Sequence, residues 1–322
     1  RSELEKHGCL FSTQTDTEVL VHGYRVWGEA LPQKLSGMFA FAVLDENSNK
    51  LFLFRDRFGI KPLYYATDSY AFAFASEIKG ILATSIFQKV INPESVSLFL
   101  ANRYIPTPLT IWKNIFKVPA ASYLSLSLND FTYTIQNYYK PVISDRMMDK
   151  EEAAGVFFNL LLNALSDHLI ADVPVGSFLS GGLDSSTLVY LMQQNLHYPT
   201  HAFSVGFKGW NESEHRYASM VANSAGATLH TEILDTIRLQ DVNKLMWYYD
   251  EPIADISILP TFAVSRLASQ HVKAVVSGEG ADELLGGYWW HKPHRFYYSS
   301  VMKKWLSKIT KLDFSQIKQH YI

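Results

Sequence analysis

The sequence SGGLDSS at residues 180–186 decides how the second half of this 322-residue chain folds and what it binds. It follows an apolar run at residues 173–179 and leads into a helical stretch at 187–194. A glycine turn between a strand and a helix exposes backbone N–H groups at the positive end of the helix dipole, where proteins hold phosphate. The two glycines give a phosphate room to approach, and Asp184 adds a carboxylate that can hold Mg²⁺ on that anion. The pattern predicts a phosphate-binding loop, against the plain alternative of a glycine turn capped by Asp and Ser.

A second glycine turn, SGEGADELLGGY at residues 277–288, follows another apolar run at 272–276. Here Asp282 could supply a second carboxylate for magnesium, and Glu279 could contact a substrate amine or a phosphate-bound water. Between the two turns, DEPIADIS at residues 250–257 is a polar, proline-broken segment in apolar surroundings. Each acidic cluster alone is explained as a solvated cap. Two acidic glycine turns after strands are better explained by a nucleotide crevice at the carboxyl ends of parallel strands.

The first loop is not the common P-loop, because no Lys-Ser or Lys-Thr pair follows its glycines. It resembles the PP-loop of enzymes that cleave ATP to AMP and pyrophosphate. Three further motifs lie in the first half: TDTEVL at 15–20, SGMFAFA at 36–42 and RDRFGIKPLYY at 55–65. With these motifs in this order, nearly the whole chain resembles the glutamine-dependent asparagine synthetases of the B type.

This resemblance implies an N-terminal-nucleophile glutaminase joined to a synthetase of the ATP-pyrophosphatase type. It also implies a reaction, in which ammonia freed from glutamine travels through an internal tunnel to a β-aspartyl-AMP. The products would be asparagine, AMP and pyrophosphate. The implied partners are ATP with Mg²⁺, glutamine and aspartate, and a homodimer is expected by analogy with other family members.

The composition agrees with such an enzyme. The chain is long enough for two domains with cores of their own, and its hydrophobic content of 48% and net charge of −2 suit a cytoplasmic globular protein. No basic stripe points to nucleic acid, and no signal peptide or long apolar run points to a membrane. A single cysteine excludes an intrachain disulfide framework and a cysteine-cluster zinc site.

The chain divides within residues 141–149. We expect a glutaminase-type domain at residues 1–143, lacking its start, and an asparagine-synthetase-type ATP-binding domain at 144–322, incomplete at its C-terminal end. The fold class is α/β and α+β: a stacked antiparallel-sheet sandwich of the N-terminal-nucleophile type, then a parallel-sheet α/β domain. In the first half we predict a helix at 17–27 and strands at 38–44, 50–54 and 70–75. Because both faces of these strands are apolar, the sheet should be covered on both sides.

In the second half, Asp149 and Glu152 resemble a capping box that opens a helix through Ile170. Apolar runs and helical stretches then alternate. We predict strands at 173–179, 202–207 and 272–276, and helices at 187–195, 212–226 and 258–270. This alternation predicts a parallel sheet with helices on both faces.

The resemblance also assigns roles to individual residues. The pyrophosphate-binding set is Ser180, Gly181, Gly182, Asp184, Ser185 and Ser186. Other nucleotide contacts are Leu179 and Val205 beside the adenine, and Ser277 and Gly278 through their backbone. The magnesium ligands would be Asp184 and Asp282. The catalytic set is Asp184, Asp282 and Glu279, of which Glu279 would bind the acceptor or guide the protons of ammonia. Asp255 and Ser257 are weaker candidates for the acceptor pocket, and Asp16 would hold the α-amino group of glutamine. The 55–65 motif is expected to be structural, shaping the domain interface and the tunnel mouth.

The departures from the family pattern matter as well. The family's glutaminase nucleophile is an N-terminal cysteine whose own α-amino group serves as base. The single cysteine here is Cys9, eight residues after Arg1, so we expect Cys9 to be a packing residue. A lysine that family synthetases carry beyond the acidic motif has no match in residues 302–322. Since a chain that began in mid-domain would leave strand edges unpaired, we expect a longer protein.

Three functions stay open. The first is synthesis of asparagine from aspartate, ATP and glutamine. The second uses the same adenylation on another carboxylate, such as a sugar acid, a peptide or a β-amino acid that cyclises, because the motifs report ATP chemistry and not the acceptor. The third is a non-catalytic module that binds nucleotide or a partner.

Overall fold

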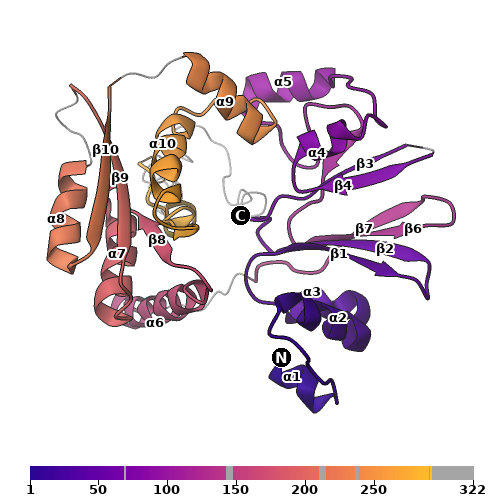
Figure 1. The fold of residues 1–322 in the computed structure, drawn as a ribbon, viewed down its shortest axis with the longest axis horizontal. Helices are drawn as coiled ribbons and strands as arrows, with labels where there is room; N and C mark the ends of the chain where they lie inside the picture. Colours follow the sequence, from indigo (N-terminus) through magenta and orange to yellow (C-terminus); the bar gives the residue numbers. More distant parts are fainter. Residues whose placement is uncertain (69, 143–147, 210–214, 236–238, 290, 292–322) are drawn as a thin grey trace, which may run out of the picture. The chain divides into compact units, whose positions relative to one another are not determined.

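The computed structural model describes residues 1–68, 70–142, 148–209, 215–235, 239–289 and 291. The chain forms two compact units (Figure 1). Unit 1 is Arg1–Met147 together with Arg238–Ile256, and unit 2 is Met148–Ile237 together with Ser257–Ile322. The chain therefore leaves unit 2 once, packs with unit 1 and returns. The boundary predicted between residues 143 and 144 lies outside the described residues, so the domain limits stay a prediction.

Unit 1 is built from two antiparallel sheets with helices outside them. Its helices are α1 (Ser2–Lys6), α2 (Asp16–Trp27), η1 (Gly28–Ala30), α3 (Leu31–Lys34), α4 (Ile78–Ala83), α5 (Pro93–Asn102) and α9 (Leu239–Tyr249). Its strands are β1 (Ala40–Asp45), β2 (Lys50–Arg55), β3 (Tyr64–Thr67), β4 (Phe72–Ala75), β5 (Ile115–Lys117), β6 (Ser122–Ser127) and β7 (Tyr133–Asn137). One sheet has the order β1-β2-β6-β7 and the other β4-β3-β5.

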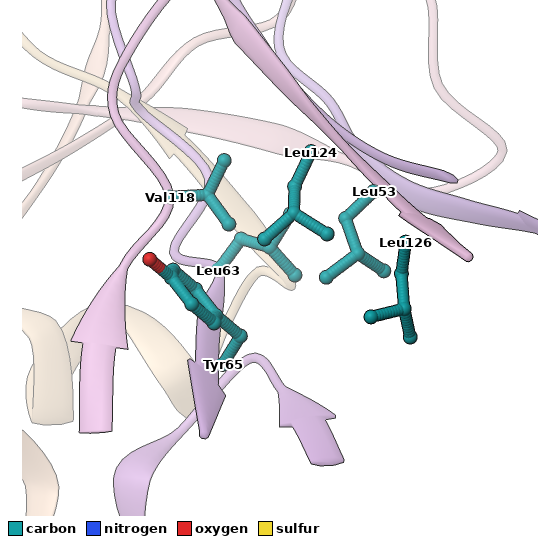
Figure 2. Close-up of a cluster of buried hydrophobic side chains, with 6 residues drawn as sticks. All are labelled: Leu53, Leu63, Tyr65, Val118, Leu124 and Leu126. Carbon is teal, nitrogen blue, oxygen red and sulfur yellow. The ribbon is translucent and has the colours of Figure 1, made fainter. Parts of the chain in front are cut away.

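Successive side chains of β2 point to opposite faces of its sheet, and this explains how the layers stack. Leu53 points into the core between the two sheets, which Figure 2 shows with its neighbours. These neighbours are Leu63, Tyr65, Val118, Leu124 and Leu126. Phe52 and Phe54 point to the opposite face, where Tyr24 of α2 packs on them. Beyond the second sheet, Ile78 and Ile81 of α4 form a further buried cluster. The prediction of a sandwich that is covered on both sides is confirmed.

Unit 2 is one parallel sheet with helices around it. Its helices are α6 (Lys150–His168), α7 (Leu183–Tyr190), the π-helical turn η2 (Leu191–Asn195), α8 (His215–Ala225), α10 (Ile258–Ser269) and α11 (Ala281–Leu285). Its strands are β8 (Val175–Phe178), β9 (His201–Phe207), β10 (Thr228–Leu234) and β11 (Ala274–Val276). They lie in the order β10-β9-β8-β11, and every neighbouring pair is parallel.

Helices cover both faces of this sheet, as predicted. Ala202 and Phe203 are neighbours in β9 and therefore face opposite sides. Ala202 belongs to a buried cluster with α7 and α8, and Phe203 to one with α10. The helix opened by Asp149 is also present, because the Asp149 carboxylate accepts the N–H of Glu152 at 2.8 Å. It ends at His168, two residues before the predicted end.

The strand order places a topological switch point between β8 and β11. From β8 the chain moves outward to β9 and β10, and then it returns to β11 on the other side of β8. In open α/β sheets, ligands bind outside the carboxyl ends of the strands at such a point. Among the helices of the described residues, none is long and apolar enough to cross a membrane.

Candidate active site

The first glycine turn joins the end of β8 to the start of α7, at the switch point. Gly181 has a φ of +85°, and a Cβ at this position would lie 2.5 Å from the Cβ of Tyr217 and 2.7 Å from the backbone N of Ala218. The turn thus lies against the backbone of α8, and only glycine fits both the dihedral angle and the space. The sequence therefore requires a glycine here for structural reasons, independent of any ligand.

Serine side chains hold the turn in shape. The hydroxyl of Ser185 accepts the N–H of Ser180 at 3.2 Å and lies 3.0 Å from the Ser180 hydroxyl. The Ser180 hydroxyl in turn accepts the N–H of Gly182 at 3.2 Å. Gly182 is the N-cap of α7, and the helix has no side-chain cap there. The first N–H groups of α7 consequently stay available for an anion.

The second glycine turn follows β11 and leads into α11. A Cβ at Gly278 would lie 3.0 Å from the Cβ of Asp184 and 3.4 Å from the N of Ser185, so the two turns are in close contact. Gly280 adopts a φ of +91° immediately before α11 and so turns the chain into the helix. The contact follows from topology, because both turns lie at the carboxyl ends of adjacent parallel strands.

Together the two turns line a cavity of about 610 Å³, within the range of about 300 to 1,000 Å³ that is typical of ligand sites. Nine residues predicted from the sequence line it: Ser180, Gly182, Asp184, Ser185, Ser257, Ser277, Gly278, Glu279 and Asp282. Four others are Phe178, Gly280, Glu283 and Tyr288. The cavity lies wholly within unit 2.

Several predicted site residues lie outside this lining. Leu179 is buried under α7 and α8, and Val205 packs against the cluster of α10. Gly181 and Ser186 belong to the turn and to α7 but do not face the cavity. Asp255 belongs to unit 1, whereas Ser257, two residues later, lines the cavity in unit 2. The predicted pairing of Asp255 and Ser257 in one pocket is therefore not found in the lining.

The cavity is acidic. Asp184, Glu279, Asp282 and Glu283 line it, and no Lys, Arg or His is among its described lining residues. A hydrogen bond of 2.7 Å from the Tyr288 hydroxyl holds the pKa of Glu283 below its usual value, so this carboxylate is ionised at neutral pH. An anionic ligand would need backbone N–H groups and a cation to offset these charges.

The donor set suits a hard divalent cation carried by a phosphate. Asp184 and Asp282 line the same cavity, and carboxylate oxygens are the protein ligands that Mg²⁺ prefers. Within the described residues, no three His, Cys, Asp or Glu side chains cluster as a complete metal site.

Comparison with protein-family models matches residues 157–318, half of the chain, to the asparagine synthase model. The chain belongs to the asparagine synthase family. A glutamine amidotransferase domain model matches residues 1–139, within unit 1.

Relatives of known name extend this likeness. The chain is 38% identical over 293 residues to a putative glutamine-hydrolysing asparagine synthetase 2 of Methanocaldococcus jannaschii, covering 89% of this chain and 56% of that protein. It is 35% identical over 289 residues to the glutamine-hydrolysing asparagine synthetase 1 of Bacillus subtilis, covering 89% and 45%. Amidase chry2 of Gibberella zeae is 30% identical over 302 residues, covering 86% and 44%. The chain spans about half the length of these relatives.

The amidotransferase part of this family member contains the remaining predicted residue, Asp16. It is the exposed first residue of α2, and its carboxylate accepts the N–H of Thr17 at 2.8 Å. The loop before it is fixed by Glu18, whose carboxylate accepts the N–H groups of Ser12 and Thr13, each at 2.7 Å. Cys9 is half-buried beside α1, and its N–H donates to Leu4. The glutamine-binding role of Asp16 stays a prediction.

In the 55–65 motif, the charged side chains of Arg55 and Asp56 bind backbone groups of unit 1, which agrees with a structural role. Asp56 is 1% exposed and accepts the N–H groups of Phe58, Ile60 and Lys61. The guanidinium of Arg55 donates to three backbone carbonyls of unit 1.

Sequence reasoning missed three side chains of the cavity, Phe178, Glu283 and Tyr288. Glu283 and Tyr288 lie inside the motif at 277–288, and Phe178 directly precedes Leu179. Phe178 and Glu283 are adjacent to the assigned residues Leu179 and Asp282, which could have signalled them. The direction of a side chain at the end of a strand or of a short helix is nevertheless set by the fold. The tyrosine in particular returns to the cavity through the turn after α11.

Proposed function

We propose that the complete protein is a glutamine-hydrolysing asparagine synthetase, in which unit 2 uses ATP to amidate aspartate and releases AMP and pyrophosphate. The observation that carries this proposal is the cavity of about 610 Å³ that both glycine turns line together. Membership of the asparagine synthase family supports the same reading.

The first turn and the start of α7 would hold the β- and γ-phosphates of ATP. The uncapped N–H groups of α7 and the turn stabilised by Ser180 and Ser185 support this role. Asp184 and Asp282 would hold Mg²⁺ on the phosphates. When bound, Mg²⁺ offsets the charge that builds up on the leaving pyrophosphate. The acidity of the cavity is what makes a cation necessary for ATP to bind there.

The acceptor carboxylate would attack the α-phosphorus, break the bond to the pyrophosphate and form a β-aspartyl-AMP. Ammonia would then attack the acyl carbon, release AMP and lose a proton. Glu279 lines the same cavity as Asp184 and is our candidate to bind the acceptor or to guide that proton. Ser257 is a candidate for the acceptor side. The main contribution of the cavity would be to align the carboxylate with the α-phosphate.

In unit 1, Asp16 would bind the α-amino group of glutamine. The amidotransferase match at residues 1–139 supports a source of ammonia in this part of the protein. We further propose that the enzyme acts in the cytoplasm, and a homodimer remains the expectation from the family.

The test is pyrophosphate release by the complete protein with ATP, Mg²⁺ and ammonium chloride, with and without aspartate. We expect release that depends on aspartate, and asparagine in equal amount to AMP. Glutamine should replace ammonium. If ATP binds but aspartate leaves the rate unchanged, asparagine synthesis is excluded. If no carboxylate gives AMP, the protein is a nucleotide-binding module without turnover.

Two observations favour a second candidate, amidation or cyclisation of a different carboxylate. A relative of similar identity carries the name amidase rather than asparagine synthetase. The described lining contains no Lys, Arg or His to select the second carboxylate of aspartate. AMP formation with a panel of sugar acids, peptides and amino acid derivatives separates the two candidates.

A further inference from the structure

In the segment DEPIADIS at residues 250–257, only the last residue, Ser257, has a role in the function proposed above, although the segment begins with two adjacent carboxylates. Its first seven residues belong to unit 1 and its last, Ser257, belongs to unit 2. Asp250 and Glu251 do not line the nucleotide cavity. Their partners in unit 1 indicate what they do instead.

Asp250 ends α9 and fastens that helix to α4. It has a φ of +61°, in the left-handed region that Asp tolerates better than most residues, and so turns the chain out of the helix. Its carboxylate accepts the backbone N–H of Lys79 at 3.3 Å and lies 3.2 Å from the Lys79 ammonium. The side chain is only 9% exposed. These bonds use both oxygens of the carboxylate.

Glu251 is held in the same way. One oxygen accepts the N–H of Ile111 at 3.0 Å, and the other lies 2.7 Å from the ammonium of Lys117. The Glu251 and Lys117 side chains are 12% and 15% exposed, so little solvent screens this pair. Three residues later, the N–H of Ala254 donates to the carbonyl of Arg103 at 2.9 Å. Every one of these partners lies in unit 1.

The far end of the same segment is part of the cavity. Ser257 lines it and is the N-cap residue of α10, whose Val264 and Leu267 pack on the central strands. Only residues 252–256 separate Ser257 from the anchored Glu251. A displacement at either end must therefore be absorbed by five residues, one of which is the stiff Pro252.

We propose that residues 250–256 are a coupling strap, through which unit 1 senses whether the nucleotide cavity of unit 2 is occupied. Asp250 and Glu251 are positioning residues: they touch no substrate, and they act on the acceptor side of the cavity through Ser257. The strap gives the glutaminase unit a covalent link to the wall that ammonia and the acceptor must reach. The link to a glutaminase and to the acceptor side rests on the proposed function. The slower exchange of the strap when nucleotide binds does not depend on which reaction follows.

The experiment is hydrogen–deuterium exchange of the complete protein with and without α,β-methylene-ATP and Mg²⁺. This analogue cannot be cleaved between the α- and β-phosphates. We expect slower exchange at residues 180–186, which hold the phosphates, and also at residues 253–257, by about tenfold. The second effect is the one that the strap predicts, since residues 253–256 do not line the cavity.

Two variants test the buried ion pair of Glu251 and Lys117, which we call the anchor, and a third variant serves as the control. Glu251→Gln and Lys117→Met each remove one side of the buried ion pair. Lys208→Met makes the same substitution in an exposed pair with Asp235, where both side chains are more than 65% exposed, at 68% and 69%. We expect the anchor variants to lose the nucleotide-dependent slowing at 253–257 while they keep it at 180–186. The Lys208→Met variant should keep both.

The outcomes separate this proposal from the proposed function. No protection at 180–186 in the wild type would overturn nucleotide binding and thereby the proposed function. Protection at 180–186 without any at 253–257 would overturn the strap alone. The strap is also overturned if the anchor variants keep the full response at 253–257. An anchor variant in which unit 1 fails to fold would also lose the slow exchange of β2 and β6 in that unit, and the other anchor variant then decides.

Discussion

Two glycine turns in this molecule carry an aspartate each, and they use it in opposite ways. In unit 1, the turn after β2 contains Asp56 and Gly59, whose φ is +65°. In unit 2, the turn after β8 contains Gly181, with a φ of +85°, and Asp184 opens the helix that follows. Both turns follow a strand of a central sheet, and both need glycine. The two turns share an aspartate and a glycine at positive φ, and they differ in where the charge is directed.

The difference lies in the hydrogen bonds that each aspartate makes. Asp56 is 1% exposed and accepts the N–H groups of Phe58, Ile60 and Lys61 from its own turn. Among the described residues, the Asp184 carboxylate has no hydrogen-bond or ion-pair partner, and it faces the cavity. A turn that uses up its own donors and charge is structural. A turn that leaves them facing a cavity is available for a ligand, which is the role that we propose for the turn of unit 2. Substitutions should separate these two roles.

The largest effect is expected for Asp184→Asn, which should lower the rate of pyrophosphate release. This change keeps the size of the side chain and removes the charge that would hold Mg²⁺. Pyrophosphate release should fall about 100- to 1,000-fold, because stabilisation of the leaving group is lost. The unfolding free energy of unit 2 should change by less than about 1 kcal/mol, since no described partner loses a bond. Steady-state kinetics and a urea titration measure the two quantities. If pyrophosphate release falls by less than tenfold, Asp184 is not a ligand of the metal.

The next largest effect is expected for Asp56→Ala, which should lower the stability of unit 1. Several buried N–H groups would lose their acceptor, which should lower the unfolding free energy of unit 1 by about 3 kcal/mol. Amide exchange in β2 and β6 reports this loss locally. Nucleotide affinity should not change, so this variant is the counterpart of Asp184→Asn. The comparison fails if Asp56→Ala weakens nucleotide binding while unit 1 keeps its stability.

The same comparison explains what the sequence could predict. Both glycine turns of unit 2 were predicted because strand, turn and helix follow one another locally, and their contact follows from the parallel sheet. Strand β10 was missed because it reads TLHTEIL, with polar residues along a strand that is exposed at several positions. Runs of apolar residues, the signal used for the other strands of unit 2, do not mark such an edge strand.

Other features depend on partners far away in the sequence. The segment that follows α9 is held to the rest of unit 1 by ion pairs such as Lys117 with Glu251, which no local pattern indicates. For the same reason, the unit 1 contacts of DEPIADIS could not be predicted, because its carboxylates resemble those of the candidate site until their partners are known. Asp255 and Ser257 were both assigned to the acceptor pocket by the family resemblance, yet the chain passes from one unit to the other between them.

A smaller effect is expected from glycine substitutions within unit 2. Gly181→Ala adds a Cβ that would lie 2.5 Å from Tyr217 Cβ, and it also forces alanine into a positive φ of +85°. Gly226→Ala is the matched control, with a φ of +78° and no atom within 4 Å of the added Cβ. Gly226→Ala should cost about 1 kcal/mol from its dihedral angle alone. Gly181→Ala should cost about 2 to 4 kcal/mol and weaken nucleotide binding as well.

Thermal unfolding and titration with α,β-methylene-ATP measure these effects. If both variants lose the same stability and keep the same affinity, the first turn does not depend on its contact with α8. Its shape would then be set by the serine hydrogen bonds alone.

The smallest effect concerns Glu18, a second carboxylate of unit 1 that its own loop satisfies. Hydrogen bonds from the N–H of Ser12, and then from the hydroxyl and N–H of Thr13, lower its pKa from 4.5 to about 2. Because the folded protein binds this proton less readily than the unfolded chain, Glu18 contributes its stability above pH 4.5. That contribution should disappear progressively as the pH falls from 4.5 to 2.

The variant Glu18→Gln tests whether the contribution of Glu18 to stability is lost as the pH falls. Its deficit in unfolding free energy relative to wild type should be larger at pH 6 than at pH 3, as measured by urea titration at each pH. Glu151→Gln is the control, because the exposed Glu151 in the first turn of α6 has no hydrogen-bond partner among the described residues. A deficit for Glu18→Gln that stays constant with pH would mean that its loop donors do not bind the charged form. Glu18 would then differ from Asp56, and a loop that surrounds a carboxylate with N–H groups would not by itself identify a structural charge.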